Sequence, residues 1–180
     1  MKSSSYAWGV GALLLAMVGA AGCSSEGAKR EFTVPRALCG VSVPSQALSR
    51  LLPSGGARIS FRKDGGSEEG WTLCQVRVDE KTVMEISQEW IVAGDTARNI
   101  LGHRLTIWRQ KSADGGSVVY AAQGGASLVV CRGEDVQKED VSTLIDVLKP
   151  GRPDEAAMGR LVRGYTKSMK AQNPCHPRNE

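Results

Sequence analysis

The sequence contains few of the residues on which most catalytic and metal sites depend. Its 180 residues include two histidines, His103 and His176, and aromatic residues make up 5%. Neither histidine lies in a recognisable nucleophile, metal or triad pattern, and no Gly-x-Ser-x-Gly, His-x-x-x-His or phosphate-loop sequence occurs. We therefore interpret both histidines as structural or solvated. The sequence predicts a protein that is not an enzyme and that uses no cofactor or metal.

An apolar run long enough to cross a membrane comfortably is also missing. The apolar stretch near the start covers residues 7–21, follows Lys2, and ends in small residues just before Cys23. A basic start, a short apolar segment and small residues at the cleavage point are typical of a cleaved signal peptide. Residues 1–22 are therefore predicted to be removed on export.

The end of this segment, Val-Gly-Ala-Ala-Gly-Cys at residues 18–23, resembles a lipobox, although Ala20 stands where Leu is commoner. The resemblance implies that Cys23 receives a diacylglyceryl group, becomes the mature N-terminus, and anchors the protein on the outer face of a bacterial cytoplasmic membrane. Two acyl chains provide the double hydrophobic signal that stable anchoring requires. The alternative is ordinary secretory cleavage nearby, with Cys23 as a spare thiol.

Cysteine is present in an odd number, which calls for an explanation in an exported protein. Lipidation of Cys23 leaves four cysteines for two bridges, without the close pairs of a zinc site. Of the three possible connectivities we prefer Cys39 with Cys74 and Cys131 with Cys175, because each pair ties one end of an expected helix to a strand.

Charge of one sign is not in large excess. The mature chain keeps 22 of the 23 Lys and Arg residues against 19 Asp and Glu, a net charge of +3. A nucleic-acid-binding surface needs basic residues concentrated with stacking aromatics, so the composition excludes nucleic acid as a partner.

The mature chain is expected to form one domain, residues 32–180, behind a lipidated N-terminus and flexible tether at residues 23–31. Pro44 opens a short helix that ends at Pro53, since proline suits the first helical turn. Alternation of apolar and polar residues indicates strands with one wet face, and short polar connections favour antiparallel hairpins. The expected strands cover residues 57–63, 71–78, 82–92, 103–109, 117–122 and 126–132.

Three further features bear on the sheet. Gly124 and Gly125 indicate a bulge or a close backbone approach. Residues 141–148 have apolar positions at helical spacing, but the segment is short and β-branched, so strand is favoured over helix. Glu85 and Glu89 fall on the same wet face of one strand, which explains them better than a catalytic carboxylate pair does.

The last expected helix begins after Pro153 and Asp154 and has an apolar stripe that should pack across the sheet. On its other side four basic residues recur within roughly a quarter-turn of one another: Arg160, Arg163, Lys167 and Lys170. A solvated outer face explains them. The alternative is contact with anionic lipid headgroups or an anionic wall polymer.

With these features in place, the chain resembles a loose group of small actinobacterial envelope lipoproteins of unknown function. The shared outline is a Leu38-Cys39 entry, a short helix, strands carrying Cys74 and Cys131, and a final helix that ends at Cys175. The resemblance implies an α+β fold in which an antiparallel sheet packs against a C-terminal helix, with a short N-terminal helix and two disulfides. It supplies no activity or site.

From these features we expect a membrane-anchored extracytoplasmic lipoprotein that acts as a non-catalytic binding or accessory module. Its expected partner is another envelope protein, a wall polymer or an anionic lipid. The alternatives are a small envelope hydrolase with an unidentified active site and a carrier of a lipid-like ligand. A cleft with clustered titratable groups would indicate the hydrolase, and an apolar pocket between sheet and helix would indicate the carrier.

Overall fold

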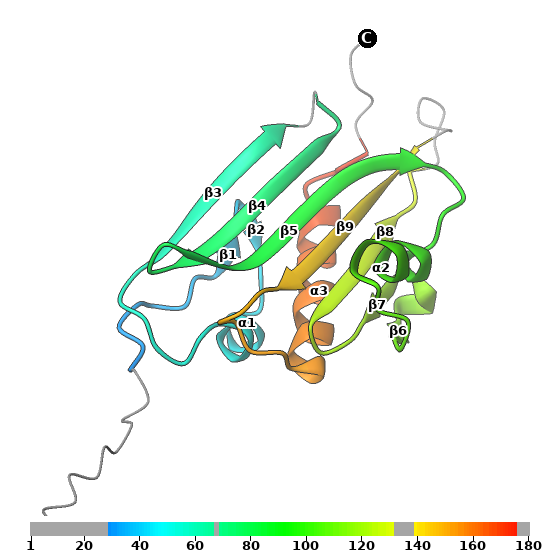
Figure 1. Cartoon of the computed structure of the whole chain (residues 1–180). Helices are drawn as coiled ribbons and strands as arrows, with labels where there is room; N and C mark the ends of the chain where they lie inside the picture. The colour runs from blue at the N-terminus through cyan, green and yellow to red at the C-terminus, as the bar shows by residue number, and fades with distance from the viewer. Residues whose placement is uncertain (1–28, 67–68, 132–138, 176–180) are drawn as a thin grey trace, which may run out of the picture.

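A computed structural model of the chain describes residues 29–66, 69–131 and 139–175, and within these ranges it confirms the α+β class (Figure 1). A seven-stranded antiparallel sheet has the order β3-β4-β5-β9-β8-β7-β6, and a small hairpin pairs β1 with β2. The strands are β1 Ala37–Leu38, β2 Val41–Ser42, β3 Ile59–Gly66, β4 Trp71–Val78, β5 Lys81–Val92, β6 Lys111–Ala113, β7 Val118–Tyr120, β8 Gly124–Val129 and β9 Glu139–Val147. The helices are α1 Ser45–Leu51, α2 Ala97–Leu105 and α3 Glu155–Lys170, with a 3-10 turn at Asp114–Gly116.

The large sheet is built from two meanders. Strands β3, β4 and β5 are neighbours in chain order, and so are β6 to β9, with residues 130–138 between β8 and β9. Helix α2 connects the two meanders, and β9 then pairs with β5 to join them into one sheet. Short connections between neighbouring strands are what antiparallel hairpins require, as the polar turns predicted. The segment expected as strand or helix, residues 141–148, is strand β9.

Helices α1 and α3 cover one face of the sheet, and α2 covers the other face over β7, β8 and β9 (Figure 1). Side chains alternate between the faces, as the strand period of two requires. In β4, Cys74, Val76 and Val78 point into the core beneath α1 and α3, whereas Gln75 and Arg77 point to the opposite side. The expected single wet face is therefore found only over β3, β4 and β5.

The two expected terminal helices are confirmed. Pro44 is the N-cap of α1, whose Ala47, Leu48 and Leu51 are buried. In α3, the carboxylate of Asp154 accepts a hydrogen bond from the backbone N–H of Ala157, which satisfies one of the free donors at the helix start. The apolar stripe of α3 is almost fully buried against the sheet and comprises Met158, Leu161, Val162, Tyr165 and Met169.

Both expected disulfides are present, Cys39–Cys74 and Cys131–Cys175. The first fastens the β1–β2 turn to β4. The second fastens the segment after α3 to the end of β8. Each bridge therefore fastens a segment next to a helix, before α1 or after α3, to the sheet that the helix covers.

The strand predicted at residues 103–109 is wrong. Residues 97–105 form α2, and the hydroxyl of Thr96 accepts a hydrogen bond from the N–H of Asn99 at its start. Thr106 then takes a left-handed conformation that ends the helix. Leu105 and Ile107 both pack on the same small core, although Leu105 is helical and Ile107 is not. The edge strand β6 begins at Lys111, beyond the predicted segment.

The two neighbouring glycines of β8 allow the close backbone approach that the sequence predicted. A side chain on Gly125 would place its Cβ 2.5 Å from Cγ2 of Val162 on α3, and one on Gly124 would lie 2.6 Å from Cδ1 of Leu105 on α2. Helices thus press on β8 from both faces. The strand retains its regular pairing with β9 at this point, so no bulge is needed.

Candidate functional site

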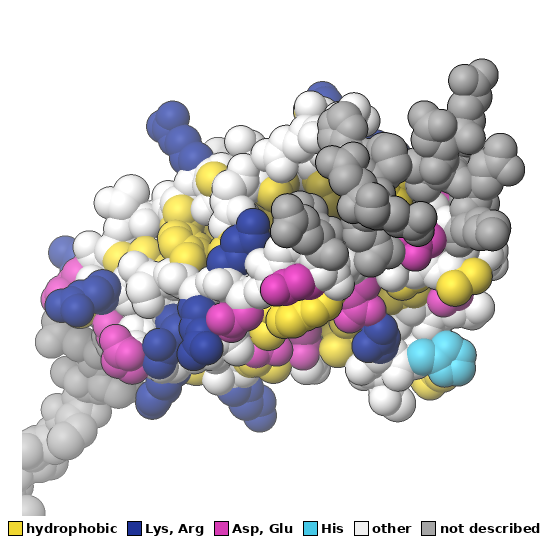
Figure 2. All heavy atoms as spheres, turned by 90° about the horizontal axis from the view of Figure 1, so that it is seen from above, with side chains coloured by type: hydrophobic (Ala, Val, Ile, Leu, Met, Phe, Trp, Pro, Cys, Tyr) yellow, Lys and Arg dark blue, Asp and Glu magenta, His cyan; other side chains and the backbone are white. Residues whose placement is uncertain are grey.

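The four basic residues of α3 form one exposed face along the helix. Arg160, Arg163, Lys167 and Lys170 are all exposed, while the opposite side of α3 is buried against the sheet. On the face seen in Figure 2, acidic and basic side chains are interspersed. A face carrying one sign of charge over most of a 16-residue helix is therefore a distinct feature.

This face is also recessed. All four basic residues line a hollow of about 590 Å³, which we call the α3 groove. Its other walls come from the start of α1, through Pro44, and from the β6–β7 turn, through Asp114 and Ser117. Sequence spacing found the basic wall, but the other walls lie more than 40 residues away along the chain and become neighbours only in the fold.

Electrostatically the α3 groove is only partly neutralised. Nε of Arg163 lies 3.4 Å from Oδ1 of Asp114, and both side chains are about half exposed. Within the described ranges, Arg160, Lys167 and Lys170 form no ion pair with a carboxylate. Exposed ion pairs contribute little to stability, so an external anion can compete for Arg163 at small cost.

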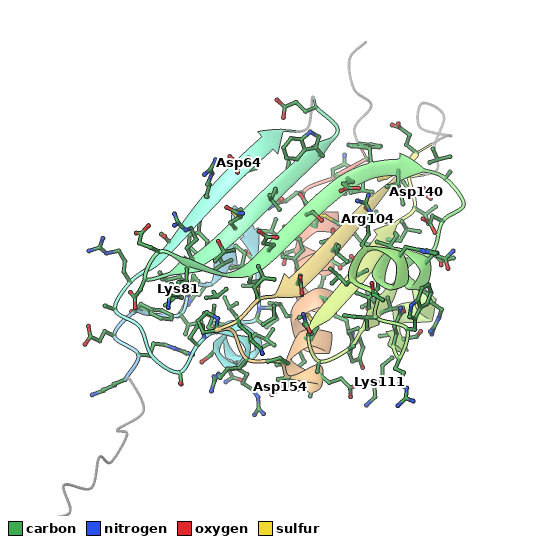
Figure 3. The ribbon with its side chains drawn as sticks, viewed as in Figure 1. Asp64, Lys81, Arg104, Lys111, Asp140 and Asp154 are labelled. Carbon is green, nitrogen blue, oxygen red and sulfur yellow. A yellow bond between two sulfur atoms is a disulfide. The ribbon has the colours of Figure 1, made fainter. Side chains whose placement is uncertain are left out.

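The two glutamates of β5 share one face of the sheet, as predicted, but each has its own partner. The side-chain amide of Gln75 donates a hydrogen bond of 2.8 Å to Oε1 of Glu85. Arg104 of α2 forms an ion pair with Glu89, reaching across from the helix to the strand (Figure 3). Sequence reasoning missed this pair because Arg104 was assigned to a strand. These carboxylates hold structure together and do not face each other across a cleft.

Groups with perturbed pKa values do not gather in one place. Burial raises the pKa of Tyr165, which lies on the buried face of α3. Burial also raises the pKa of the Asp146 carboxyl, against a hydrogen bond from Gln123, and Asp146 points to the opposite face of the sheet. His103 is exposed at the end of α2, edge-on to the ring of Trp108. Asp146 pairs across the strands with Glu85, whose charge adds to the rise in the Asp146 pKa. The residues that the structure describes contain no group of three metal-ligating side chains.

A second hollow lies between the start of β4, the C-terminal part of β5 and the C-terminal part of α3. It is lined by Trp71, Trp90 and Met169, and measures about 180 Å³. Gln88 crosses it, donating a hydrogen bond to the sulfur of Met169 and accepting one from the hydroxyl of Thr72. Pockets for drug-sized ligands measure roughly 300–1,000 Å³, so this hollow is smaller than a usual ligand pocket.

The N-terminal attachment of the domain begins earlier than the expected boundary at residue 32. Arg30 hydrogen-bonds to α1 and the residues after it, and the N–H of Glu31 donates to the carbonyl of Gly56. Cys23 and His176 lie outside the described residues. Within the described residues no helix is long and apolar enough to span a membrane. Comparisons with protein-family models, curated proteins and solved structures find no match.

Proposed function

We propose that this protein is a lipid-anchored lipoprotein of a bacterial cell envelope, held on the outer face of the cytoplasmic membrane through Cys23. The observation that carries the proposal is the pairing of the four other cysteines. Cys39–Cys74 and Cys131–Cys175 use every cysteine except the one in the lipobox-like segment. Disulfides persist in oxidising compartments, which supports export, and a fifth cysteine left over at residue 23 supports its modification.

Replacing Cys23 by Ser should abolish membrane attachment or stall processing, because the thioether forms on that sulfur. Detergent partitioning and mass measurement of the mature N-terminus check this expectation. Ser24→Ala is the matched control, since it changes the neighbouring residue and keeps the thiol. A wild-type protein without lipid, or one that begins at another residue, contradicts the proposed anchor.

The mature domain acts, in this proposal, as a non-catalytic module that binds an anionic polymer of the envelope in the α3 groove. Four exposed cations along one helix supply the charge, and the hollow between α3, Pro44 and Asp114 supplies the shape. A linear polymer can lie inside the α3 groove, whereas a flat bilayer surface can contact only the rim of the groove. A conformationally flexible chain bearing phosphate or carboxylate groups therefore fits better than a lipid surface.

Changing Arg160, Arg163, Lys167 and Lys170 together to Gln should remove binding to linear polyphosphate. Each removed charge costs about 1 kcal/mol of binding, so the affinity should fall by more than about a hundredfold. Gln preserves helix propensity, and these side chains are exposed, so the thermal midpoint should barely move. Fluorescence anisotropy with labelled polyphosphate at low and high salt measures the effect.

A matched control removes four other exposed cations, Arg58, Lys63, Lys81 and Arg109, with the same change in net charge. We expect this variant to lose less than about tenfold, since these residues do not line the groove. Equal losses in both variants would show non-specific attraction. A third outcome would assign the groove to lipid instead. In it, the wild-type protein binds anionic vesicles but not polyphosphate, and the quadruple Gln variant of α3 loses the vesicle binding.

A further inference from the structure

Two arginines meet at the C-terminal end of α1. Arg30 donates from Nη2 to the carbonyl of Ser49 at 2.9 Å and to that of Leu52 at 3.2 Å. Arg152, from the segment before α3, donates to the same two carbonyls, from Nη2 to Ser49 at 2.9 Å and from Nε to Leu52 at 2.8 Å. The two guanidinium groups are therefore side by side on shared acceptors, although their residues are 122 positions apart (152 minus 30).

The position of Arg30 is fixed on several sides. Its Nε donates to the carbonyl of Pro53 and its Nη1 to the hydroxyl of Ser49, while the guanidinium lies 5.2 Å above the ring of Phe32. Partial burial and, second, the charge of Arg152 hold the pKa of Arg30 below its usual range. Two like charges are thus kept adjacent by a rigid set of neutral groups.

Neither guanidinium has an acidic partner among the described residues. The nearby Arg50 is different, because it forms an ion pair with Asp154 at the start of α3, at the lower end of the view in Figure 3. The helix C-terminus supplies partial negative charge, which stabilises the two cations but does not neutralise them. Arg152 is exposed and uses two of its five N–H groups on these carbonyls, so it keeps donors for an external group.

This arginine pair lies at the point where the chain enters the domain. Seven residue steps separate Cys23 from Arg30, and a fully extended chain covers them in at most about 25 Å. If Cys23 carries the lipid, the pair is held within that distance of the bilayer surface. This end of the domain, with α1 and the start of α3, is the end at which the described chain begins (Figure 1).

We propose that Arg30 and Arg152 bind the phosphate of an anionic phospholipid headgroup and so orient the anchored domain on the membrane. The inference rests on the proposed anchoring, which supplies the lipid surface as the nearest anion. A phosphate oxygen accepts strong charge-assisted hydrogen bonds from guanidinium groups, and two adjacent guanidiniums without carboxylate partners attract its negative charge.

The experiment uses the chain from Ser24 to Glu180, which contains every described element. Sedimentation with vesicles of phosphatidylglycerol and phosphatidylcholine measures its partition coefficient, with pure phosphatidylcholine vesicles for comparison. Arg152→Gln should lower partition into the anionic vesicles about five- to tenfold. Arg109→Gln, an exposed residue on the loop after α2, removes the same charge and should lower it less than about twofold.

A second variant, Arg152→Lys, keeps the charge and loses the planar fork. Binding by the arginine pair predicts that this variant loses about threefold or more, whereas general attraction predicts no loss. Thermal unfolding verifies that each variant is folded. Equal effects of Arg152→Gln and Arg109→Gln, or no effect of either, would overturn the inference.

A nuclear magnetic resonance titration separates the two sources of phosphate. Short-chain dihexanoyl phosphatidylglycerol should shift the side-chain Nε–H signals of Arg30 and Arg152 at lower concentration than inorganic phosphate does at matched ionic strength. Equal or tighter binding of inorganic phosphate would assign the pair to a free anion and overturn the headgroup assignment. The chain used here lacks Cys23, so these binding measurements test the arginine site alone. The proposed anchor is tested separately, by the mass of the mature N-terminus of the full-length protein.

Discussion

Replacing Cys39 and Cys74 together by Ser should lower the free energy of unfolding by about 3–4 kcal/mol. The bridge closes a loop with a sequence separation of 35, so its loss returns that conformational freedom to the unfolded chain. Loss of the bridge also weakens the folded state, at the β1–β2 hairpin. The β1–β2 hairpin has two residues in each strand, and Cys39 in its turn has a positive φ of 46°. A hairpin this short has little stability of its own.

Urea denaturation of the oxidised protein measures this loss. Cys74 is 4% exposed, so a serine hydroxyl there would add a burial cost of its own. The paired Cys39→Ala and Cys74→Ala variant separates the two causes, because it removes the crosslink without burying a hydroxyl. If the free energy of unfolding of the double alanine variant is within about 1 kcal/mol of the wild-type value, the crosslink is not the stabilising element.

The sequence predicted those elements whose apolar pattern is strong and complete. In α3 every third or fourth residue is large and apolar, and Asp154 supplies a cap, so both the start and the buried face followed from the pattern. The alternation around Cys74 in β4 gave that strand and its inward face. Of the three possible disulfide connectivities, the preferred one, which ties one end of each expected helix to a strand, is the one found.

Helix α2 could not be found in this way. Of its nine residues only Ala97, Ile100, Leu101 and Gly102 are buried, and Gly102 and His103 lower its helix propensity. Its position depends on tertiary contacts, since the ring of Trp108 packs against Gly102. A short helix of this kind is stabilised by what it covers, and that information is not local.

The candidate sites divide in the same manner. The spacing of Arg160, Arg163 and Lys167 predicted a common face on α3, but not that Pro44 and the β6–β7 turn would make it the wall of a groove. The arginine pair left no sequence signal at all. Arg30 reaches the carbonyls of Ser49 and Leu52 from 19 and 22 residues away, and Arg152 reaches the same carbonyls from 103 and 100 residues away. Arg30 and Arg152 become neighbours only because both bind the C-terminal end of α1 in the folded protein.

Replacing Gly125 by Val should destabilise the domain by about 3 kcal/mol, because it overfills the contact between β8 and α3. The first carbon of any side chain there would lie 2.5 Å from Cγ2 of Val162 and 3.2 Å from the carbonyl oxygen of Val119. The carbonyl belongs to the paired strand β7 and cannot withdraw. Val162 is fully buried, so its rotation only transfers the clash to its neighbours.

Gly66→Val provides the matched control for this overpacking. Gly66 also lies in a strand of the same sheet, and a Cβ built on it meets nothing within 4 Å. The two substitutions therefore add the same atoms to the same kind of backbone and differ in the space around them. Urea denaturation should show a change of less than about 0.5 kcal/mol for Gly66→Val.

Because α3 carries the basic wall, Gly125→Val should also weaken polyphosphate binding in the folded protein, whereas Gly66→Val should leave it unchanged. Equal stability of the two variants would mean that α3 can move away from β8 freely, and the groove would then not be a fixed feature of the domain.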